Sequence, residues 1–195
     1  MTHQRFIADL HVHSRYARAC SKELTPAIIE KWCRIKGIQV VGTGDFTHPK
    51  WYAELVESLN HDPETANLYR LKNTPDSPVR FICGTEISSI YKHTDKVRRV
   101  HNLVFAPSLE IVKKINSALT ERGCNIKSDG RPIIGLSSHD LLELLLEIDE
   151  RSVLIPAHAW TPWFAVFGSK SGYNSLEECF GDLTKHVFAI ETGLS

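Results

Sequence analysis

Short apolar runs alternate with amphipathic segments along the chain, and this alternation restricts the possible folds more than any other feature of the sequence. The runs lie at Phe6–Leu10, Gln39–Thr43, Arg80–Cys83, Leu103–Ala106, Val153–Pro156 and Val187–Ile190. Strands that alternate with helices usually pair in parallel, because each helix carries the chain back along the face of the sheet. The sequence therefore predicts an α/β fold with a largely parallel sheet.

Four helices are expected between these strands. The first begins after Thr25 and Pro26, a capping residue followed by a proline that suits the first helical position, and it ends at Gly37. The others are expected at about Trp51–Leu59, at about Leu109–Arg122, and from the Ser137-Ser138 cap to Ile148. The segments Asn60–Pro78, Asn125–Gly135 and Ala159–Asn174 are expected to be loops, where binding residues often lie.

Length and composition predict one soluble domain over residues 1–195. The 42% of hydrophobic residues excludes wholesale disorder. Basic and acidic residues number 23 each, so no global field attracts nucleic acid, although a local basic patch could still bind DNA. The five cysteines form no C-x-x-C pair, and no apolar run is long enough to cross a bilayer. We expect reduced thiols, a cytoplasmic location and no membrane partner.

Ten histidines are the unusual part of the composition, because imidazole is the commonest metal ligand. Asp9, His11 and His13 share one face of the first expected strand, since side chains alternate along a strand. Two imidazoles on one face can hold a metal ion, with Asp9 as a hydrogen-bond acceptor that orients a ring. The alternative is a pair of exposed histidines at a strand end.

Further ligand-type side chains accompany the later strands. Asp45 and His48 follow the second, where α/β folds place active sites, although both could instead cap the next helix. Glu86 ends the third strand, His101 begins the fourth and His158 follows the fifth. Alone, each would more often be structural, but the series over five strands favours a metal site. The histidines expected at the surface or in caps are His3, His61, His93, His139 and His186.

Together these residues resemble the polymerase and histidinol phosphatase (PHP) family of metal-dependent phosphoesterases. The motifs that carry the resemblance are, in order, DLHVH, TGDFTH, GTEIS, VHNLVFA and PAHAW. Four longer segments are similar to the endonuclease Q branch, whose members nick DNA beside deaminated bases: SRYARACSKELT, VVGTGDFTHPKW, AHAWTPWFAVFGSKSGYNSLEECFGD and AIETGLS. The resemblance covers nearly the whole chain.

The resemblance implies an irregular, seven-stranded type of parallel β/α barrel with metals at the strand C-termini. It implies that Glu86 bridges two ions and that Asp45 or His48 serves a third. The implied ligands are His11, His13, Asp45, His48, Glu86, His101 and His158, of which His11, His13, Glu86 and His158 form the catalytic set. Zinc is the expected metal, with manganese or magnesium as alternatives, at two to three ions per intact site. Two such ions can activate water and neutralise a phosphate.

Two departures from the family pattern affect these expectations. Residues 14–19, after the first motif, include no further histidine or acid, which weakens the third metal site. The family's last motif, an Asp-x-His after ETGLS, is absent. We therefore expect an N-terminal fragment, with a barrel incomplete at its C-terminal end, further sequence after Ser195, and an activity that needs a direct test.

Aromatic and basic side chains near the ligands are expected to bind substrate, since aromatic rings stack on extruded bases and cations bind phosphates. These residues are Arg15, Arg18, Trp160, Trp163, Phe164 and Phe167, and Lys92, Lys96, Arg98 and Arg99 form a further basic run. Solvated charges and an apolar cover for the barrel are the alternatives.

Three functions remain open. A metal-dependent DNA endonuclease acting beside deaminated or damaged bases is favoured. A histidinol phosphatase-like phosphomonoesterase and a non-catalytic nucleic-acid-binding module are the alternatives.

Overall fold

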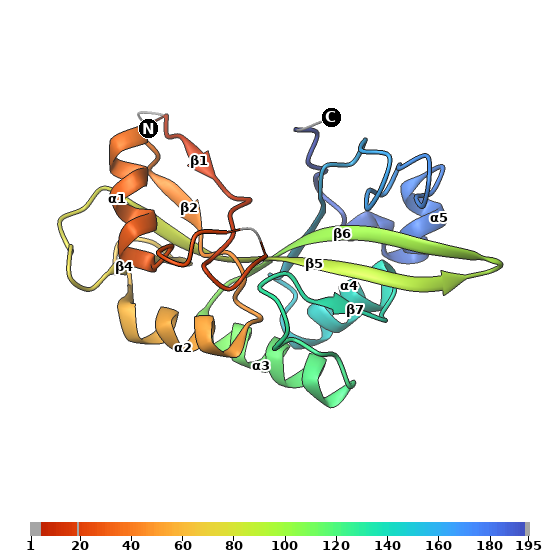
Figure 1. Cartoon of the computed structure of the whole chain (residues 1–195), viewed down its shortest axis with the longest axis horizontal. Coiled ribbons are helices and arrows are strands. Elements are labelled where there is room, and N and C mark those ends of the chain that lie inside the picture. The colour runs from red at the N-terminus through yellow and green to blue at the C-terminus, as the bar shows by residue number, and fades with distance from the viewer. Residues whose placement is uncertain (1–4, 19, 194–195) are drawn as a thin grey trace.

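The computed structural model describes residues 5–18 and 20–193 of the chain (Figure 1). The strands are β1 (Ala8–Asp9), β2 (Val40–Gly42), β3 (Leu59–His61), β4 (Leu68–Leu71), β5 (Arg80–His93), β6 (Lys96–Ala106), β7 (Ile133–Ile134) and β8 (Val153–Pro156). The helices are α1 (Pro26–Lys36), α2 (Pro49–Ser58), α3 (Leu109–Glu121), α4 (Ser138–Ile148), α5 (Leu176–Phe180) and the 3-10 helix η1 (Gly181–His186). His3 lies outside the described residues. No helix in the described ranges is both long and apolar enough to span a bilayer.

The sheet is mixed, which corrects the expectation of a largely parallel one. β1, β2 and β5 are parallel neighbours, and β7 also runs parallel to β5. β4 and β6 each pair antiparallel with β5, β3 pairs antiparallel with β4, and β8 pairs antiparallel with β6. Within the described residues, strand pairing does not join β1 to β8, so closure into a barrel is not shown.

A long hairpin explains the difference. β5 and β6 extend far beyond the apolar runs expected at Arg80–Cys83 and Leu103–Ala106, and they pair along their whole shared length to His93 and Lys96. Only two residues then link the strands, and a two-residue loop forces antiparallel pairing. Figure 1 shows this hairpin projecting from the side of the molecule opposite β1.

Other segments also depart from the expected elements. The expected loop Asn60–Pro78 contains most of β3 and all of β4, and Asn125–Gly135 contains β7. Val187–Ile190 is no strand, although the Glu191 N–H donates to the carbonyl of Pro156 beside β8. The segment Ala159–Asn174 is irregular, as expected, whereas α5 and η1 were not among the expected elements.

The helices follow their sequence signals closely. Thr25 caps α1 by accepting a hydrogen bond from the Ile28 N–H, and Gly37 ends the helix in the left-handed conformation. Ser108 and Ser137 cap α3 and α4 in the same way. In Figure 1, α2, α3 and α4 lie along one side of the sheet. Their fully buried side chains, which pack with the sheet into one core, include Trp51, Leu55, Ile115, Leu119, Leu141 and Leu142.

Candidate metal centre

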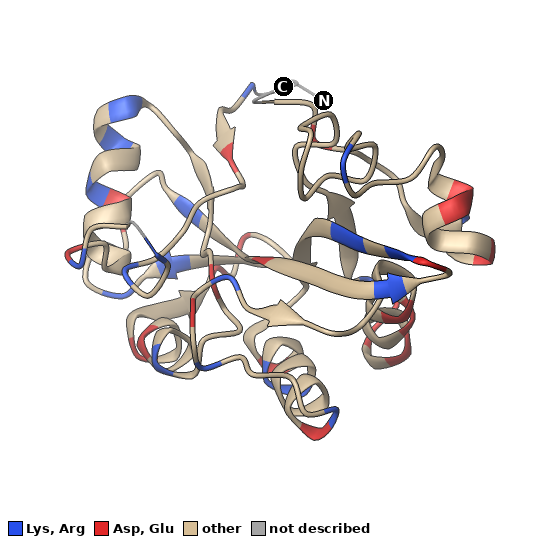
Figure 2. Cartoon of the chain, turned by 45° about the vertical axis from the view of Figure 1, so that its right-hand side comes forward, with Lys and Arg blue, Asp and Glu red and all other residues tan. Residues whose placement is uncertain are grey.

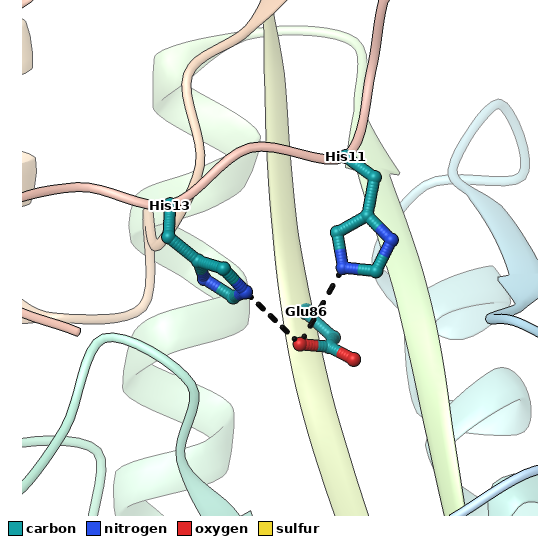
Figure 3. Close-up of side chains that lie close together, drawn as sticks. All are labelled: His11, His13 and Glu86. Carbon is teal, nitrogen blue, oxygen red and sulfur yellow. Dashed lines mark ion pairs between the residues drawn. The ribbon is translucent and has the colours of Figure 1, made fainter. Parts of the chain in front are cut away.

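Five of the predicted ligand residues meet in one place. His11 and His13 follow β1, Glu86 lies on β5, His101 lies on β6, and His158 follows β8. β1 ends at Asp9, so the two N-terminal histidines are not on a strand, but both rings still point to Glu86 (Figure 3). Strands distant in sequence thus bring the five side chains together.

The two oxygens of Glu86 each face a pair of imidazoles. The N-terminal pair, His11 and His13, places its Nε2 atoms 3.5 Å and 3.2 Å from Glu86 Oε2. The inner pair, His101 and His158, places Nδ1 and Nε2 respectively at 2.7 Å and 3.2 Å from Glu86 Oε1. A carboxylate arranged in this way can bridge two cations, each of which would also bind two imidazoles.

The donor set fits divalent metals. Ligand atoms of His11, His13 and Glu86 all lie within 4.8 Å of one another, and so do those of Glu86, His101 and His158. Each group combines two nitrogens with one oxygen, a mixture that suits zinc or manganese better than magnesium or calcium. Three protein ligands per ion would also leave coordination positions open for water or substrate.

The imidazoles hold Glu86 in its charged form. Burial alone would raise the pKa of this carboxyl group, whose side chain is only 1% exposed. Hydrogen bonds from the four surrounding imidazoles reverse that effect and keep the pKa well below its usual range. The oxygen atoms are therefore negative and ready to bind cations.

Two carboxylates behind the N-terminal pair orient its rings. His13 Nδ1 lies 2.8 Å from Asp45 Oδ1, and Asp45 also accepts hydrogen bonds from the backbone N–H and the hydroxyl of Ser14. His11 Nδ1 lies 2.9 Å from Glu191 Oε1, and the other Glu191 oxygen accepts from the His158 N–H at 2.7 Å. A carboxylate on Nδ1 points Nε2 of the same ring into the site. Asp9, the residue expected in this role, makes neither of these hydrogen bonds.

A tight turn puts Asp45 in place. Gly44 approaches the backbone of Val12 and has a φ of 62°, and Asp45 itself has a φ of 47°. The indole N–H of Trp51 donates to the Gly44 carbonyl at 2.7 Å and fixes this turn from the core side. Glycine suits the position because a Cβ would crowd Val12.

The structure does not bring His48 to the other ligands. His48 occupies the N-cap position of α2, and its ring stacks on Tyr16 with centroids 4.3 Å apart. Its Nδ1 atom is buried without a hydrogen-bond partner in the described part of the chain, and burial lowers the pKa of the ring. Asp45 contacts His13 from behind, so a third metal at Asp45 or His48 remains a prediction.

The aromatic segment after His158 is anchored to the inner pair. The Phe164 ring packs at a tilt against the ring of His101, with centroids 4.7 Å apart, and the Phe164 carbonyl accepts a hydrogen bond from the His101 backbone N–H. Trp160 and Trp163 are about half exposed, and Phe167 stacks on Trp160. The two tryptophans therefore present ring surface to solvent from a segment that is fixed beside the ligands.

The arginines predicted to contact phosphate differ in how exposed their side chains are and in the residues that they contact. Figure 2 shows basic residues along the β5–β6 hairpin, where the Arg99 guanidinium lies over the Trp163 ring. Arg98 is buried against Gly172 and Glu178, and Arg15 pairs with Glu54 at 2.5 Å. Arg18 is almost fully exposed.

Two residues at the centre had not been singled out from the sequence. Glu191 follows an apolar run, as Glu86 does, and this position could have drawn attention to it. Arg131, whose Nη1 lies 3.2 Å from Glu86 Oε2, comes from an expected loop and carried no signal.

Two uncharacterized proteins share sequence similarity with most of this chain. No protein-family model matches the chain. It is 29% identical over 154 residues to the uncharacterized protein MJ0043 of Methanocaldococcus jannaschii, covering 79% of this chain and 16% of that protein. It is 27% identical over 210 aligned positions to the uncharacterized protein YqxK of Bacillus subtilis, covering 98% of this chain and 49% of that protein. The chain thus spans less than half of either relative.

Solved structures give a more specific result. The lesion-specific endonuclease PfuEndoQ of Pyrococcus furiosus matches with a TM-score of 0.79 and 32% identity, over 97% of this chain and 42% of that one. Endonuclease Q bound to a 27-mer duplex with an abasic lesion at its active site matches with a TM-score of 0.74 and 33% identity, over 91% and 40% of the two chains.

A more distant structure shares the fold alone. A Bifidobacterium adolescentis protein named as a metal-dependent phosphoesterase matches with a TM-score of 0.54 and 14% identity, over 96% of this chain and 77% of that one. The chain thus has a mixed α/β fold in common with endonuclease Q and with the Bifidobacterium adolescentis protein.

Proposed function

We propose that this chain carries the metal centre of a DNA endonuclease that nicks beside deaminated or damaged bases. The observation that carries the proposal is the shared carboxylate Glu86, with one pair of imidazoles at each of its oxygens. Paired divalent ions are a common device for phosphodiester cleavage, because both the attacking and the leaving oxygen need support.

The residues of the centre have distinct roles in this proposal. His11 and His13 hold one ion, His101 and His158 hold the other, and Glu86 bridges them. When bound, the ions supply an activated water and neutralise the charge on the phosphate. Zinc is the proposed metal, because the imidazole-rich donor set favours it over magnesium, and manganese is the alternative.

Two other carboxylates keep the N-terminal pair ready for this task. Asp45 and Glu191 accept the Nδ1 protons of His13 and His11, so that each Nε2 atom faces the site. Carboxylates that accept a hydrogen bond from a metal-binding histidine typically improve metal affinity by about 10- to 100-fold.

The exposed aromatic rings support a nucleic-acid substrate. Trp160 and Trp163 lie on the segment that Phe164 anchors to His101, so they offer stacking surfaces close to the centre. Bases stack on such rings with little regard for sequence. The similarity to an endonuclease Q that binds an abasic duplex at its active site adds to this support. Recognition of deaminated bases is part of the proposal.

A nicking assay on end-labelled duplexes tests the proposal. Four duplexes would carry a single deoxyuridine, hypoxanthine, an abasic site or no lesion, and each would be incubated with zinc, manganese or EDTA. We expect metal-dependent nicking of the lesion duplexes, its loss in His13→Ala, and its retention in the exposed control His61→Ala.

The other functions predict different results. Turnover of an aryl phosphate without nicking would indicate a phosphomonoesterase. Retention of DNA without any cleavage would indicate a binding module. Either result would overturn the proposal.

A further inference from the structure

One cation reaches the metal centre without a role in the proposed function. Arg131 extends from the segment before β7, and its Nη1 donates a hydrogen bond to Glu86 Oε2 at 3.2 Å. Glu86 is buried, whereas the Arg131 side chain is 40% exposed. The guanidinium therefore lies between the buried carboxylate of Glu86 and solvent.

The backbone on both sides of Arg131 is anchored. The Gly130 N–H donates to the Tyr16 carbonyl, and the Ser88 N–H of β5 donates to the Pro132 carbonyl at 2.9 Å. Gly130 also packs directly against the carboxylate of Asp45, where a Cβ would collide. The base of the arginine is thus fixed to both the N-terminal segment and the sheet, while the end of its side chain has room to turn.

Glu86 does not need this cation once metals are bound. Both of its oxygens already face imidazole pairs that can hold divalent ions, so an arginine adds no further neutralisation. A guanidinium carries five N–H donors in a planar fork that matches two oxygens of a phosphate. Only Nη1 donates to Glu86, and within the described part of the chain no hydrogen bond from Nε or Nη2 is formed.

The arginines first expected to contact phosphate are less suitable. Arg15 is held by Glu54 at 2.5 Å, and Arg98 is buried against Gly172 and Glu178. Arg131 differs from both, because it touches the bridging carboxylate itself and is still partly open to solvent.

We infer that Arg131 binds the non-bridging oxygens of the phosphate group that is cleaved, as a phosphate subsite beside the two metal positions. This inference rests on the proposed phosphoester hydrolysis. On metal binding the guanidinium exchanges its hydrogen bond with Glu86 for hydrogen bonds with the substrate phosphate. Its task is to fix the phosphate next to the bridged ions and to offset its negative charge.

The test compares Arg131→Met with wild type and with Arg122→Met. Arg122 is a matched control, because its side chain is 44% exposed and pairs only loosely with Glu147, at 3.9 Å. Each metal-loaded protein is titrated with inorganic phosphate in a calorimeter, its metal content is measured, and its kcat and KM are determined on the deoxyuridine duplex. Arg131→Lys, which keeps the charge but not the fork, is included as a fourth protein.

We expect Arg131→Met to bind inorganic phosphate about 10- to 100-fold more weakly than wild type, the usual effect of losing a hydrogen bond between charged groups. The lysine variant falls between the two, Arg122→Met matches wild type, and all four proteins hold the same amount of metal. The kcat/KM of Arg131→Met for nicking falls by a similar factor, through a lower kcat or a higher KM.

Three results would overturn the inference, and they are distinguishable. If wild type binds phosphate and nicks DNA while Arg131→Met does so equally well, Arg131 has no phosphate role but the proposed function stands. If Arg131→Met loses metal, the arginine stabilises Glu86 rather than binding substrate. If wild type neither binds phosphate nor cleaves DNA, the proposed function fails as well.

Discussion

The two imidazole pairs at Glu86 look alike in composition but differ in environment. The N-terminal pair, His11 and His13, is more exposed and each ring has a carboxylate on both sides, since Glu86 faces Nε2 and another acid faces Nδ1. The inner pair, His101 and His158, lies deeper, and its two rings approach each other at 3.2 Å as well as Glu86. The N-terminal pair therefore has carboxylates on both sides of each ring, whereas the inner pair contacts Glu86 and is otherwise more deeply buried.

This difference changes the protonation of the rings. Burial opposes charge on His13, but hydrogen bonds to Asp45 and Glu86 raise its pKa to about 9. His11 also has a raised pKa, since Glu86 and Glu191 outweigh its burial. At His101 burial prevails and lowers the pKa. In the metal-free protein at neutral pH, His13 is thus protonated, whereas His101 is neutral.

The largest effect is expected from a change to the residue that both pairs share. Glu86→Gln removes the bridging charge, so both ions should be lost and nicking should fall by at least about 10³-fold, as expected when several kcal/mol of metal-derived stabilisation is removed. Metal content and single-turnover nicking measure the effect. The exposed Glu121→Gln serves as control, and circular dichroism establishes that both variants fold. If Glu86→Gln kept one full ion, Glu86 would not be a shared ligand.

The difference in protonation predicts two metal affinities with different pH dependence. A metal ion must displace the proton from His13, so affinity at the N-terminal pair should fall about tenfold for each pH unit below about 9. Affinity at the inner pair should stay more nearly level, because burial lowers the pKa of His101 and less proton has to be displaced from this ring. Zinc titrations at several pH values would show one site whose affinity depends steeply on pH (the steep site) and one whose affinity changes less (the level site).

Variants assign the two sites in that experiment. His13→Ala should remove the steep site, and His101→Ala should remove the level one. The same pH slope for both sites in wild type would show that the two pairs do not differ in protonation.

A smaller effect is expected from the carboxylates behind the N-terminal pair. Asp45→Asn and Glu191→Gln should each weaken metal binding at that pair by about 10- to 100-fold, because Nδ1 of the affected imidazole loses its charged hydrogen-bond acceptor. Binding at the inner pair should change much less. Calorimetric zinc titration measures both sites, with the exposed Glu150→Gln as control. Equal weakening at both pairs would mean that these carboxylates stabilise the whole centre rather than orient two rings.

The sequence was informative where structure depends on neighbours along the chain. The caps and bounds of α1 follow from Thr25, Pro26 and Gly37, because capping hydrogen bonds join residues a few positions apart. The five residues that meet at Glu86 had also been singled out, because ligand-type side chains near the ends of successive strands are visible without knowing how the strands pair.

The same reasoning failed where a functional site interrupts a structural pattern. β5 continues through buried polar residues such as Thr85, Glu86 and Ser88, so the apolar run ends long before the strand does. Glu191 and Arg131 act through contacts with residues distant in sequence, which no local pattern reports. In contrast, the apolar run Val187–Ile190 has too few backbone partners to form a strand in the described chain.

Anomalous diffraction from metal-loaded crystals tests the two-ion centre most directly. Data collected at the absorption edge of the bound metal should show two peaks about 3.5–4 Å apart, one beside each oxygen of Glu86. The peak between His101 and His158 should have the higher occupancy in crystals grown at low pH. A single peak, or metal bound at Asp45 or His48 with none beside Glu86, would contradict the account.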